Sequence, residues 1–333
     1  MRKLFLFFFF TCLTGLLTHA QERKFLFTEN KMGSPFNLVL VTDDSLKAAT
    51  LARACFDLVD TLNSLFSDYD STSELSRLNS KAGKEPMIVS SRLWNLLISS
   101  GQAWLESSHA FDITIGPLSR LWRKARKAKR FPDSLQVAQK KALVGFQQLQ
   151  LNPADHSVYL PQQDMLLDLG GIAKGYAAQA VVNYLTRKGI KQSLVDAGGD
   201  MVMTQPPPNS RGWTIGVNVP ETTDDLLPQK LLLQNKAVAT SGDAYQFIEH
   251  KGKKYSHIAD PRTGYGISSQ RNVTVIADNG AVADWLATAC SILPIKEAMQ
   301  LAKKMKAELL ITELRNKQVL YYDSPGFKRY WKR

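Results

Sequence analysis

The sequence contains few cysteines and histidines, and they are not clustered. Among its 333 residues are three cysteines and five histidines. No two histidines stand four residues apart, and neither Cys55 nor Cys290 has a cysteine or histidine neighbour at metal-ligand spacing. A zinc site is therefore not expected. We expect both cysteines to be buried as small apolar residues, and the sequence leaves open whether they pair.

The familiar nucleotide-binding signatures are absent as well. The run from Gly170 to Gly175 is rich in glycine but matches neither G-x-G-x-x-G nor a P-loop, which ends in Gly-Lys-Ser/Thr. Glycines before a helix still let backbone N–H groups approach a phosphate, and Lys174 would add a positive charge there. Simple turn geometry is the alternative explanation of these glycines.

The sequence has no internal repeat and no low-complexity linker that would divide it into separate domains. Its 44% hydrophobic and 22% charged residues are typical of a globular protein. Periodicity predicts helices over 45–65, 91–107 and within 168–188, another helix from about 281, and strands over 24–27, 35–41 and 272–277. We therefore predict an α+β fold, a single compact body of mixed or antiparallel sheets flanked by helices.

Positive charge exceeds negative charge in this chain. The formal net charge of +12 favours anionic ligands or membrane surfaces. Seven basic residues lie between Arg120 and Arg130. This run is either a solvated face of a helix or loop, or a docking surface for an acidic partner or for membrane headgroups. No nucleic-acid-binding signature accompanies it, so we expect no nucleic-acid partner.

The first twenty residues have the pattern of a secretory signal peptide. Arg2 and Lys3 precede an apolar run from Leu4 to Leu17, and small residues end the segment at Ala20. The alternative is an uncleaved membrane anchor, although the apolar run is shorter than the ~20 residues that a membrane-spanning helix needs. We predict a signal peptide over residues 1–20, one folded domain over 21–333, and an exported protein, either periplasmic or on the outer face of the cytoplasmic membrane.

Two motifs in the second half of the chain suggest chemistry at a phosphate. Asp284 and Thr288 stand four residues apart, hence on one face of the predicted helix. A carboxylate and a hydroxyl are hard oxygen ligands of the kind that Mg²⁺ prefers, but such a pair also arises by chance. His257 precedes the turn from Asp260 to Gly264, where it is either a general base or the partner in a structural hydrogen bond.

Eight motifs occur in an order that resembles the FAD:protein FMN transferase (ApbE) family, and together they cover essentially the whole chain after the signal peptide. They are Met32-Gly33; Ser67-Asp68-Tyr69 with Ser73-Glu74-Leu75 and Leu78-Asn79; Phe111 to Leu118; Asp168 to Tyr176; Asp196 to Asp200; Ala239 to Asp243; His257 to Gly264; and Ala283 to Thr288.

The resemblance implies a fold of two intimately packed lobes with an FAD cleft between them, and it assigns roles to matching residues. The implied contacts to FAD are Met32, Tyr69, Ala110, Phe111, Asp112, Asp168, Lys174 and Ile258. The implied magnesium ligands are Gly171, Asp284, Ala287 and Thr288, with Gly171 binding through its carbonyl. The implied catalytic residues are His257, Asp284 and Lys174, with His257 deprotonating the acceptor hydroxyl.

The implied activity is a Mg²⁺-dependent transfer of FMN from FAD to a threonine hydroxyl of an acceptor protein. The product is a phosphoester, AMP is released, and the acceptor is expected to be a subunit of a membrane electron-transfer complex. One alternative is a Mg²⁺-dependent FAD pyrophosphatase that uses water and gives FMN and AMP. Another is a flavin-binding or scaffold protein without catalysis.

The sequence departs from the family pattern at two places. Ala244 follows Asp243 where many members have tyrosine, which displaces the aromatic residue to Tyr245. Trp285 stands between the implied metal ligands where a small residue is common, and we expect it to narrow the cleft.

Overall fold

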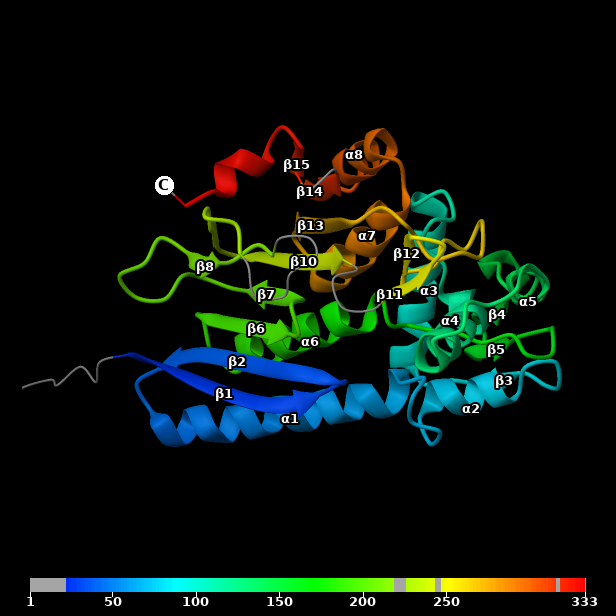
Figure 1. Cartoon of the computed structure of the whole chain (residues 1–333). Coiled ribbons are helices and arrows are strands. Elements are labelled where there is room, and N and C mark those ends of the chain that lie inside the picture. Colours follow the sequence, from blue (N-terminus) through cyan, green and yellow to red (C-terminus); the bar gives the residue numbers. More distant parts are fainter. Residues whose placement is uncertain (1–21, 219–225, 243–246, 316–317, 333) are drawn as a thin grey trace, which may run out of the picture.

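The computed structural model describes residues 22–218, 226–242, 247–315 and 318–332. The predicted signal peptide lies outside these residues, and so do Asp243, Ala244 and Tyr245. Within the described part of the chain, no helix is long and apolar enough to cross a membrane. The architecture is α+β, as predicted, and the elements form a single compact body (Figure 1).

An eight-stranded sheet forms the centre of the fold, and every neighbouring pair of its strands is antiparallel. In spatial order the strands are β1 (Arg23–Lys31), β2 (Ser34–Thr42), β6 (Ser193–Ala197), β7 (Met201–Met203), β10 (Lys236–Gly242), β13 (Arg271–Ala277), β14 (Glu308–Arg315) and β15 (Gln318–Asp323). The predicted strands over 24–27, 35–41 and 272–277 are β1, β2 and β13.

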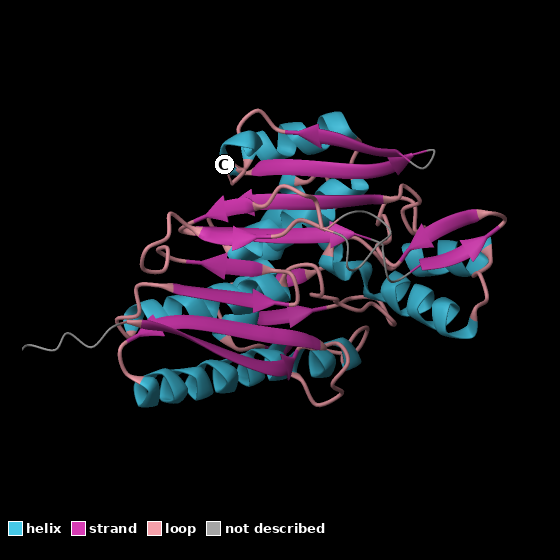
Figure 2. Cartoon of the chain, turned by 60° about the vertical axis from the view of Figure 1, so that its left-hand side comes forward, coloured by secondary structure: helices cyan, strands magenta, loops and turns pink. Residues whose placement is uncertain are grey.

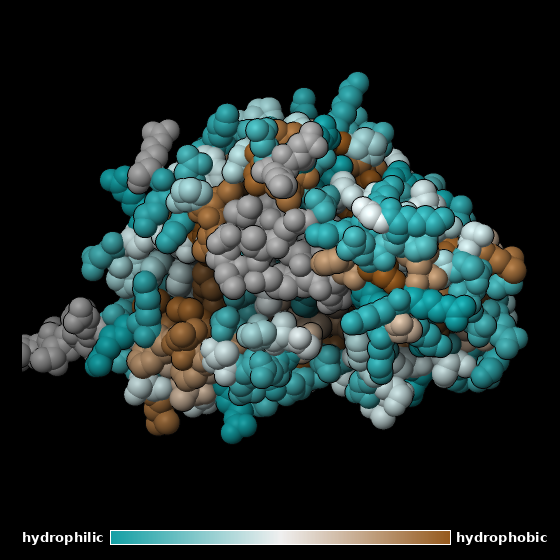
Figure 3. Space-filling view, in the orientation of Figure 1, coloured by the Kyte–Doolittle hydropathy of each residue, from teal (hydrophilic) through white to brown (hydrophobic). Residues whose placement is uncertain are grey.

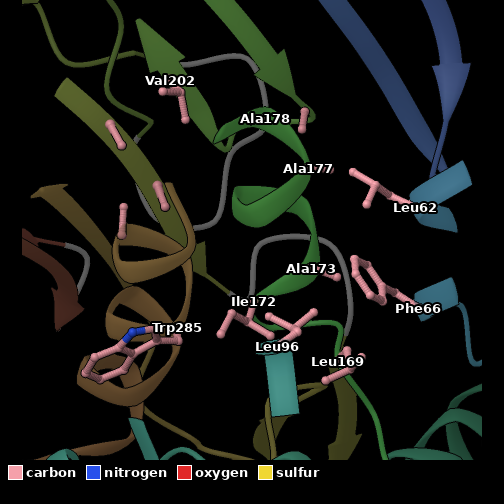
Figure 4. Packing of buried hydrophobic residues seen from close by; sticks show 14 of the residues in the cluster. Leu62, Phe66, Leu96, Leu169, Ile172, Ala173, Ala177, Ala178, Val202 and Trp285 are labelled. Carbon is pink, nitrogen blue, oxygen red and sulfur yellow. The ribbon is translucent and has the colours of Figure 1, made fainter. Parts of the chain in front are cut away.

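Helices pack against one face of this sheet. They are α1 (Ser45–Phe66), α6 (Ala173–Arg187), α7 (Gly280–Ile292) and α8 (Ile295–Lys304). Asp44 begins α1 by accepting hydrogen bonds from two backbone N–H groups of the first turn, and Asn279 begins α7 in the same way. Leu62 and Phe66 of α1, Ala177 of α6 and Trp285 of α7 belong to the large core that these helices share (Figure 4).

The opposite face of the sheet carries a second core. Along β13, Val275 belongs to the large core and Ile276 to the second core, because successive side chains of a strand point to opposite faces. The short strands β8 (Trp213–Ile215) and β9 (Leu231–Leu233) and the 3₁₀ helix η3 (Phe327–Tyr330) cover this second core.

A smaller lobe lies at one end of the sheet, as Figure 2 shows. It contains α4 (Gly116–Ala128), α5 (Ser134–Lys141) and the hairpin of β11 (Phe247–His250) and β12 (Lys253–Ser256). Its own core surrounds the buried Trp122, which packs with Val137 and Ile248. The remaining elements include several that contribute side chains to the large core, and β3, β5 and β4 form a small sheet of their own. They are α2 (Glu74–Ser80), β3 (Met87–Ile88), α3 (Ser91–Glu106), η1 (Ile113–Ile115), η2 (Phe146–Gln148), β4 (Gln150–Asn152) and β5 (Ser157–Tyr159).

Cys55 and Cys290 are both buried in the large core, as predicted, and neither forms a disulfide. Burial raises the pKa of the Cys55 thiol and that of the Cys290 thiol to about 12. Each therefore stays protonated at neutral pH and behaves as a small apolar side chain.

Candidate active site

The site begins where α6 and α7 cross at very short range. A Cβ atom on Gly175 would lie 2.2 Å from the carbonyl oxygen of Gly280 and 2.7 Å from Cβ of Asp284. A Cβ on Gly280 would in turn lie 2.3 Å from the Gly175 carbonyl oxygen. Glycine at both positions is what lets the helices touch, and the Gly175 N–H donates to Oδ2 of Asp284 at 2.9 Å. The crossing thereby holds the Asp284 carboxylate at the N-terminal turn of α6.

Negative charge accumulates around this carboxylate. Asp284 and Asp200 are both buried, and Nζ of Lys174 pairs with Oδ2 of Asp200 at 2.5 Å. Burial and the neighbouring Asp200 raise the pKa of Asp284 well above its usual range. Burial lowers the pKa of Lys174, but the carboxylates of Asp200, Asp284 and Asp196 outweigh this effect and raise it overall. Because one lysine faces several carboxylates, an additional cation would be stabilised here.

Three of the four predicted magnesium ligands, Gly171, Asp284 and Thr288, come together at the crossing of α6 and α7. A Cβ on Gly171 would lie 3.0 Å from Oγ1 of Thr288, so the Gly170–Gly171 turn touches the Thr288 hydroxyl. Thr288 lies one helical turn after Asp284 on α7. Ala287 is buried on the same helix, and its carbonyl accepts a hydrogen bond from Oγ of Ser291 at 2.9 Å.

The donor set fits Mg²⁺ better than a transition metal. Among the described residues no group of three or more His, Cys, Asp or Glu side chains could hold a metal ion. One carboxylate with neutral hydroxyl and carbonyl oxygens leaves most of a coordination shell to water and to ligand phosphates, which is how Mg²⁺ is usually bound. Burial and the neighbouring Asp200, which raise the pKa of Asp284, are effects that a bound cation would offset.

A second charged cluster lies on the other side of the Gly170–Gly171 turn. Both terminal nitrogens of Arg123 donate to Oδ2 of Asp68 at 3.0 Å, and one of them lies 3.8 Å from Oδ2 of Asp168. The guanidinium carbon stands 4.1 Å from the ring centroid of Tyr69, a cation–π contact. Burial, followed by the charge of Asp168, raises the pKa of Asp68 although Arg123 opposes the shift.

Arg123 is a site residue that sequence reasoning missed. It belongs to the basic run over 120–130, for which the sequence offered only a solvated face or a docking surface. The side chain instead connects Tyr69 and Asp168, two predicted FAD contacts. Asp200 likewise ends one of the eight motifs without an implied role, and the structure pairs it with Lys174. Both are visible only once the chain is folded, because their partners lie far away in sequence.

The segment from Ala110 to Asp112 is held in place largely by Asp112. Its buried carboxylate accepts hydrogen bonds from the backbone N–H of Thr114 at 2.8 Å and of Phe146 at 3.0 Å, and from the Thr114 hydroxyl at 2.6 Å. Burial raises the pKa of this carboxyl although these hydrogen bonds oppose the shift. The side chain of Asp112 thus fixes the loop, and the backbone N–H groups of Ala110 and Phe111 donate to the carbonyl and to Oγ of Ser107.

Trp285 does not narrow a cleft, contrary to our expectation. Its side chain is 4% exposed and packs in the large core (Figure 4). Its ring centroid lies 6.1 Å from that of Phe111. It faces inward because Asp284 and Thr288 already occupy the site-facing side of α7, and the next residue along a helix points about 100° away. The large residue fills the core behind the site.

The loop that contains His257 and Ile258 is anchored within the smaller lobe. Oγ of Ser256 accepts a hydrogen bond from the Ile258 N–H at 3.1 Å, and the Gly264 carbonyl accepts one from Nε1 of Trp122 at 2.9 Å. A cavity of about 510 Å³ adjoins this loop, and Asp260 and Ser291 are among its lining residues. The half-buried His257 is therefore carried on a loop that lies beside the C-terminal part of α7.

Met32 occupies the turn between β1 and β2 with a left-handed backbone, φ 50°, and its side chain packs against the edge of the large core. Among the described residues, Met32 packs with the large core and not with either charged cluster. Its predicted contact with FAD stays a prediction, as do the other assigned roles of single residues.

Known proteins resemble this chain along nearly its whole length. A sequence model of the ApbE family matches residues 32–311. An FAD:protein FMN transferase of Klebsiella pneumoniae is 32% identical over 267 residues, which are 80% of this chain and 81% of the relative. One of Vibrio cholerae is 27% identical over 303 residues, 90% of each chain.

Solved structures agree with these relatives. The flavin transferase ApbE from Vibrio cholerae superposes with a TM-score of 0.83 at 26% identity, covering 93% of this chain and 100% of that chain. The ApbE protein from Thermotoga maritima gives a TM-score of 0.84 at 26% identity, with the same coverage of both chains.

Proposed function

The chain belongs to the ApbE family and is a flavin transferase, and on that premise we propose that it moves FMN from FAD to a threonine hydroxyl of an acceptor protein in a Mg²⁺-dependent reaction. The observation that carries the proposal is the α6–α7 crossing. It holds the buried Asp284 beside Thr288, the Gly171 turn and the N-terminus of α6, where a cation and a phosphate would both be stabilised.

The proposed reaction is a substitution at phosphorus. The threonine oxygen forms a bond to the FMN phosphorus, the pyrophosphate P–O bond to AMP breaks, and AMP leaves with the bonding electron pair. The threonine proton passes to His257, because a hydroxyl is a weak nucleophile until a base takes its proton. No covalent intermediate on the enzyme is needed.

Each charged cluster would have its own task. Asp284, Thr288 and the carbonyls of Gly171 and Ala287 would hold Mg²⁺, which when bound neutralises charge that develops on the pyrophosphate oxygens. Lys174 and the N–H groups at the start of α6 would bind the same phosphates. Tyr69, Asp168 and Ile258 would contact the ring systems of FAD, with Arg123 fixing the first two.

The second candidate function is hydrolysis of FAD to FMN and AMP. The same carboxylate, lysine and helix N-terminus would serve that reaction, with water replacing the threonine hydroxyl. Tyr69, a predicted contact of FAD, is 78% exposed, so water reaches this part of the candidate site.

A covalent-flavin assay separates the two functions. Purified protein is incubated with FAD, Mg²⁺ and a threonine-containing acceptor protein, and flavin fluorescence on the denatured acceptor is measured together with AMP. Equal amounts of covalent flavin and AMP are expected for the wild type, and neither product for Asp284→Ala. AMP without covalent flavin on any acceptor would replace transfer by hydrolysis. In His257→Ala, we expect covalent flavin to fall while FAD binding persists.

We also propose that residues 1–20 are removed on export and that the enzyme acts outside the cytoplasm, on a subunit of a membrane electron-transfer complex. The basis is the charged, apolar and small-residue order of that segment. Fractionation of cells that produce the full chain, with N-terminal sequencing of the product, tests this. We expect an exported protein that begins at Gln21, and a cytoplasmic chain that begins at Met1 would contradict the proposal.

A further inference from the structure

Positive charge is concentrated in one part of this protein. The small lobe, defined by residues 116–145 and 247–267, contains thirteen basic and three acidic residues, a formal net charge of +10. The rest of the chain after position 20 contains 27 basic and 27 acidic residues. The whole excess of positive charge outside the predicted signal peptide therefore lies in this lobe.

Much of this charge faces solvent without a compensating carboxylate. Arg120, Lys124, Lys127, Lys129 and Arg130 are all exposed, and no residue in the described ranges forms a salt bridge with any of them. Figure 3 shows long hydrophilic side chains on its right-hand side, where Figure 1 places β11, β12 and α4. Like charges in one cluster repel each other and reduce stability, so the cluster is better explained by a partner than by folding.

The charged surface is joined directly to the candidate active site. On α4, the buried face carries Trp122, whose Nε1 donates to the carbonyl of Gly264 in the loop of His257. The next residue, Arg123, turns toward Asp68 and Asp168. A molecule bound to the outer face of α4 would thus lie next to two sides of the site.

We propose that the small lobe is the docking surface for the acceptor protein and that it binds an acidic segment flanking the target threonine. This inference rests on the proposed transfer of FMN to a protein. A partner with negative charge around its threonine is complementary to a lobe of net charge +10, and attraction at long range brings the hydroxyl toward His257 before specific contacts form.

Two other anionic partners fit the position of the charge less well. FAD is much smaller than the lobe, and its phosphates are already matched by Lys174 and the N-terminus of α6. An anionic membrane would be attracted by the charge but does not carry the threonine to which FMN is proposed to be transferred. Among the exposed large apolar side chains of the described residues, only Leu135 and Phe247 lie in this lobe, which gives a bilayer little to take up.

The test compares two variants with the same change in charge. The lobe variant is Arg120→Glu/Lys124→Glu/Lys127→Glu, and the control is Lys47→Glu/Lys188→Glu/Lys191→Glu, which changes three exposed lysines at the far end of the large sheet. The probes are two fluorescein-labelled peptides of equal length with one central threonine, flanked by Asp and Glu in one and by Lys in the other. Binding is measured by fluorescence anisotropy at low and at high salt, and FAD cleavage by AMP release.

We expect the wild type and the control to bind the acidic peptide within about threefold of each other and the lobe variant to bind it at least tenfold more weakly. This difference should shrink at high salt, because the Debye length falls to roughly 3 Å at 1 M. The lysine peptide should not bind. The KM for FAD should be unchanged in the lobe variant.

Several results would overturn the inference. If both variants bind the acidic peptide equally weakly, the net charge of the protein determines binding and the position of the charge in the small lobe does not. A raised KM for FAD in the lobe variant, with unchanged peptide binding, would mean that the charged surface binds FAD and not the acceptor. Binding of the wild type to phosphatidylglycerol vesicles but not to the acidic peptide would assign it to a membrane. If instead the wild type releases AMP but labels no threonine acceptor, the proposed function fails, and the binding data still decide the docking surface separately.

Discussion

The two charged clusters on either side of the Gly170–Gly171 turn contain similar groups in different surroundings. In one, Lys174 faces the buried Asp200 and Asp284 at a helix crossing. In the other, Arg123 faces Asp68 and Asp168 near the surface, with Tyr69 stacked on the guanidinium. The first cluster needs a further cation to balance its carboxylates, whereas the second forms a preorganised fork that fixes neighbouring side chains.

This difference indicates a division of labour. Where carboxylates are buried with too little compensation, a bound cation is held strongly and chemistry at a phosphate becomes possible. Where an arginine pairs with carboxylates that stay partly exposed, the cluster acts by positioning. Disruption of the first cluster should therefore abolish catalysis, while disruption of the second should weaken binding of FAD.

The largest effect is expected for Asp284→Asn. Loss of the charge that would hold Mg²⁺ should lower kcat by about a thousandfold, roughly 4 kcal/mol of transition-state stabilisation. AMP release at saturating FAD and Mg²⁺ measures this. Asp278→Asn, which changes an exposed carboxylate just before α7, is the control and should keep wild-type activity. Wild-type activity in Asp284→Asn would remove the metal site from this cluster.

Gly175→Ala tests the helix crossing on which that cluster depends. The added methyl group would lie 2.2 Å from the Gly280 carbonyl, so the helices must separate, at a cost of about 1–3 kcal/mol. Both the free energy of unfolding and kcat should fall, because Asp284 moves with α7. Urea unfolding and AMP release measure the two quantities. Ala180→Ser on the same helix is the control, and unchanged stability in Gly175→Ala would show that the crossing tolerates a side chain.

Arg123→Ala should have a smaller effect and one of a different kind. Without the fork, Tyr69 and Asp168 lose a shared partner, and we expect the KM for FAD to rise roughly tenfold with kcat nearly kept. Arg123→Lys should restore little, since a lysine cannot form the same fork. Arg120→Ala, one turn away and exposed, is the control. A fall in kcat without a change in KM would place Arg123 in the chemical step instead.

Local patterns in the sequence were sufficient to predict much of the fold. The helix predicted over 45–65 is α1, Ser45–Phe66, because an aspartate cap and apolar residues at helical spacing define it locally. The helix predicted over 91–107 is α3, Ser91–Glu106. Beyond the helix predicted from about 281, local patterns define no further element, yet this part of the chain contains α8, β14 and β15. Edge strands such as β15 are defined by pairing with a neighbour, which a local pattern does not show.

The candidate site was only partly predictable. Asp284 and Thr288 could be placed on one helical face from their spacing, and the structure confirms this. Their proximity to Gly171 depends on how α6 packs against α7, which spacing along the sequence does not show. Only the resemblance to a family implied that Gly171 belongs to the same site. The role of Arg123 could not be predicted, because its three partners lie more than forty residues away in the sequence.

The smallest expected effect concerns the pH dependence of the second cluster. Burial and the charge of Asp168 raise the pKa of Asp68 above its ordinary value of 3.8, so folding disfavours the ionised form of this carboxyl. Relative to Asp68→Asn, the wild type should therefore be most stable at pH values below 3.8. It should lose this stability as the pH rises through the pKa that Asp68 has in the folded state. For one group the slope cannot exceed about 1.4 kcal/mol per pH unit, and Arg123 reduces it further. Urea unfolding of both proteins between acidic and neutral pH measures the difference, and a difference of opposite sign would mean that the ion pair with Arg123 outweighs burial.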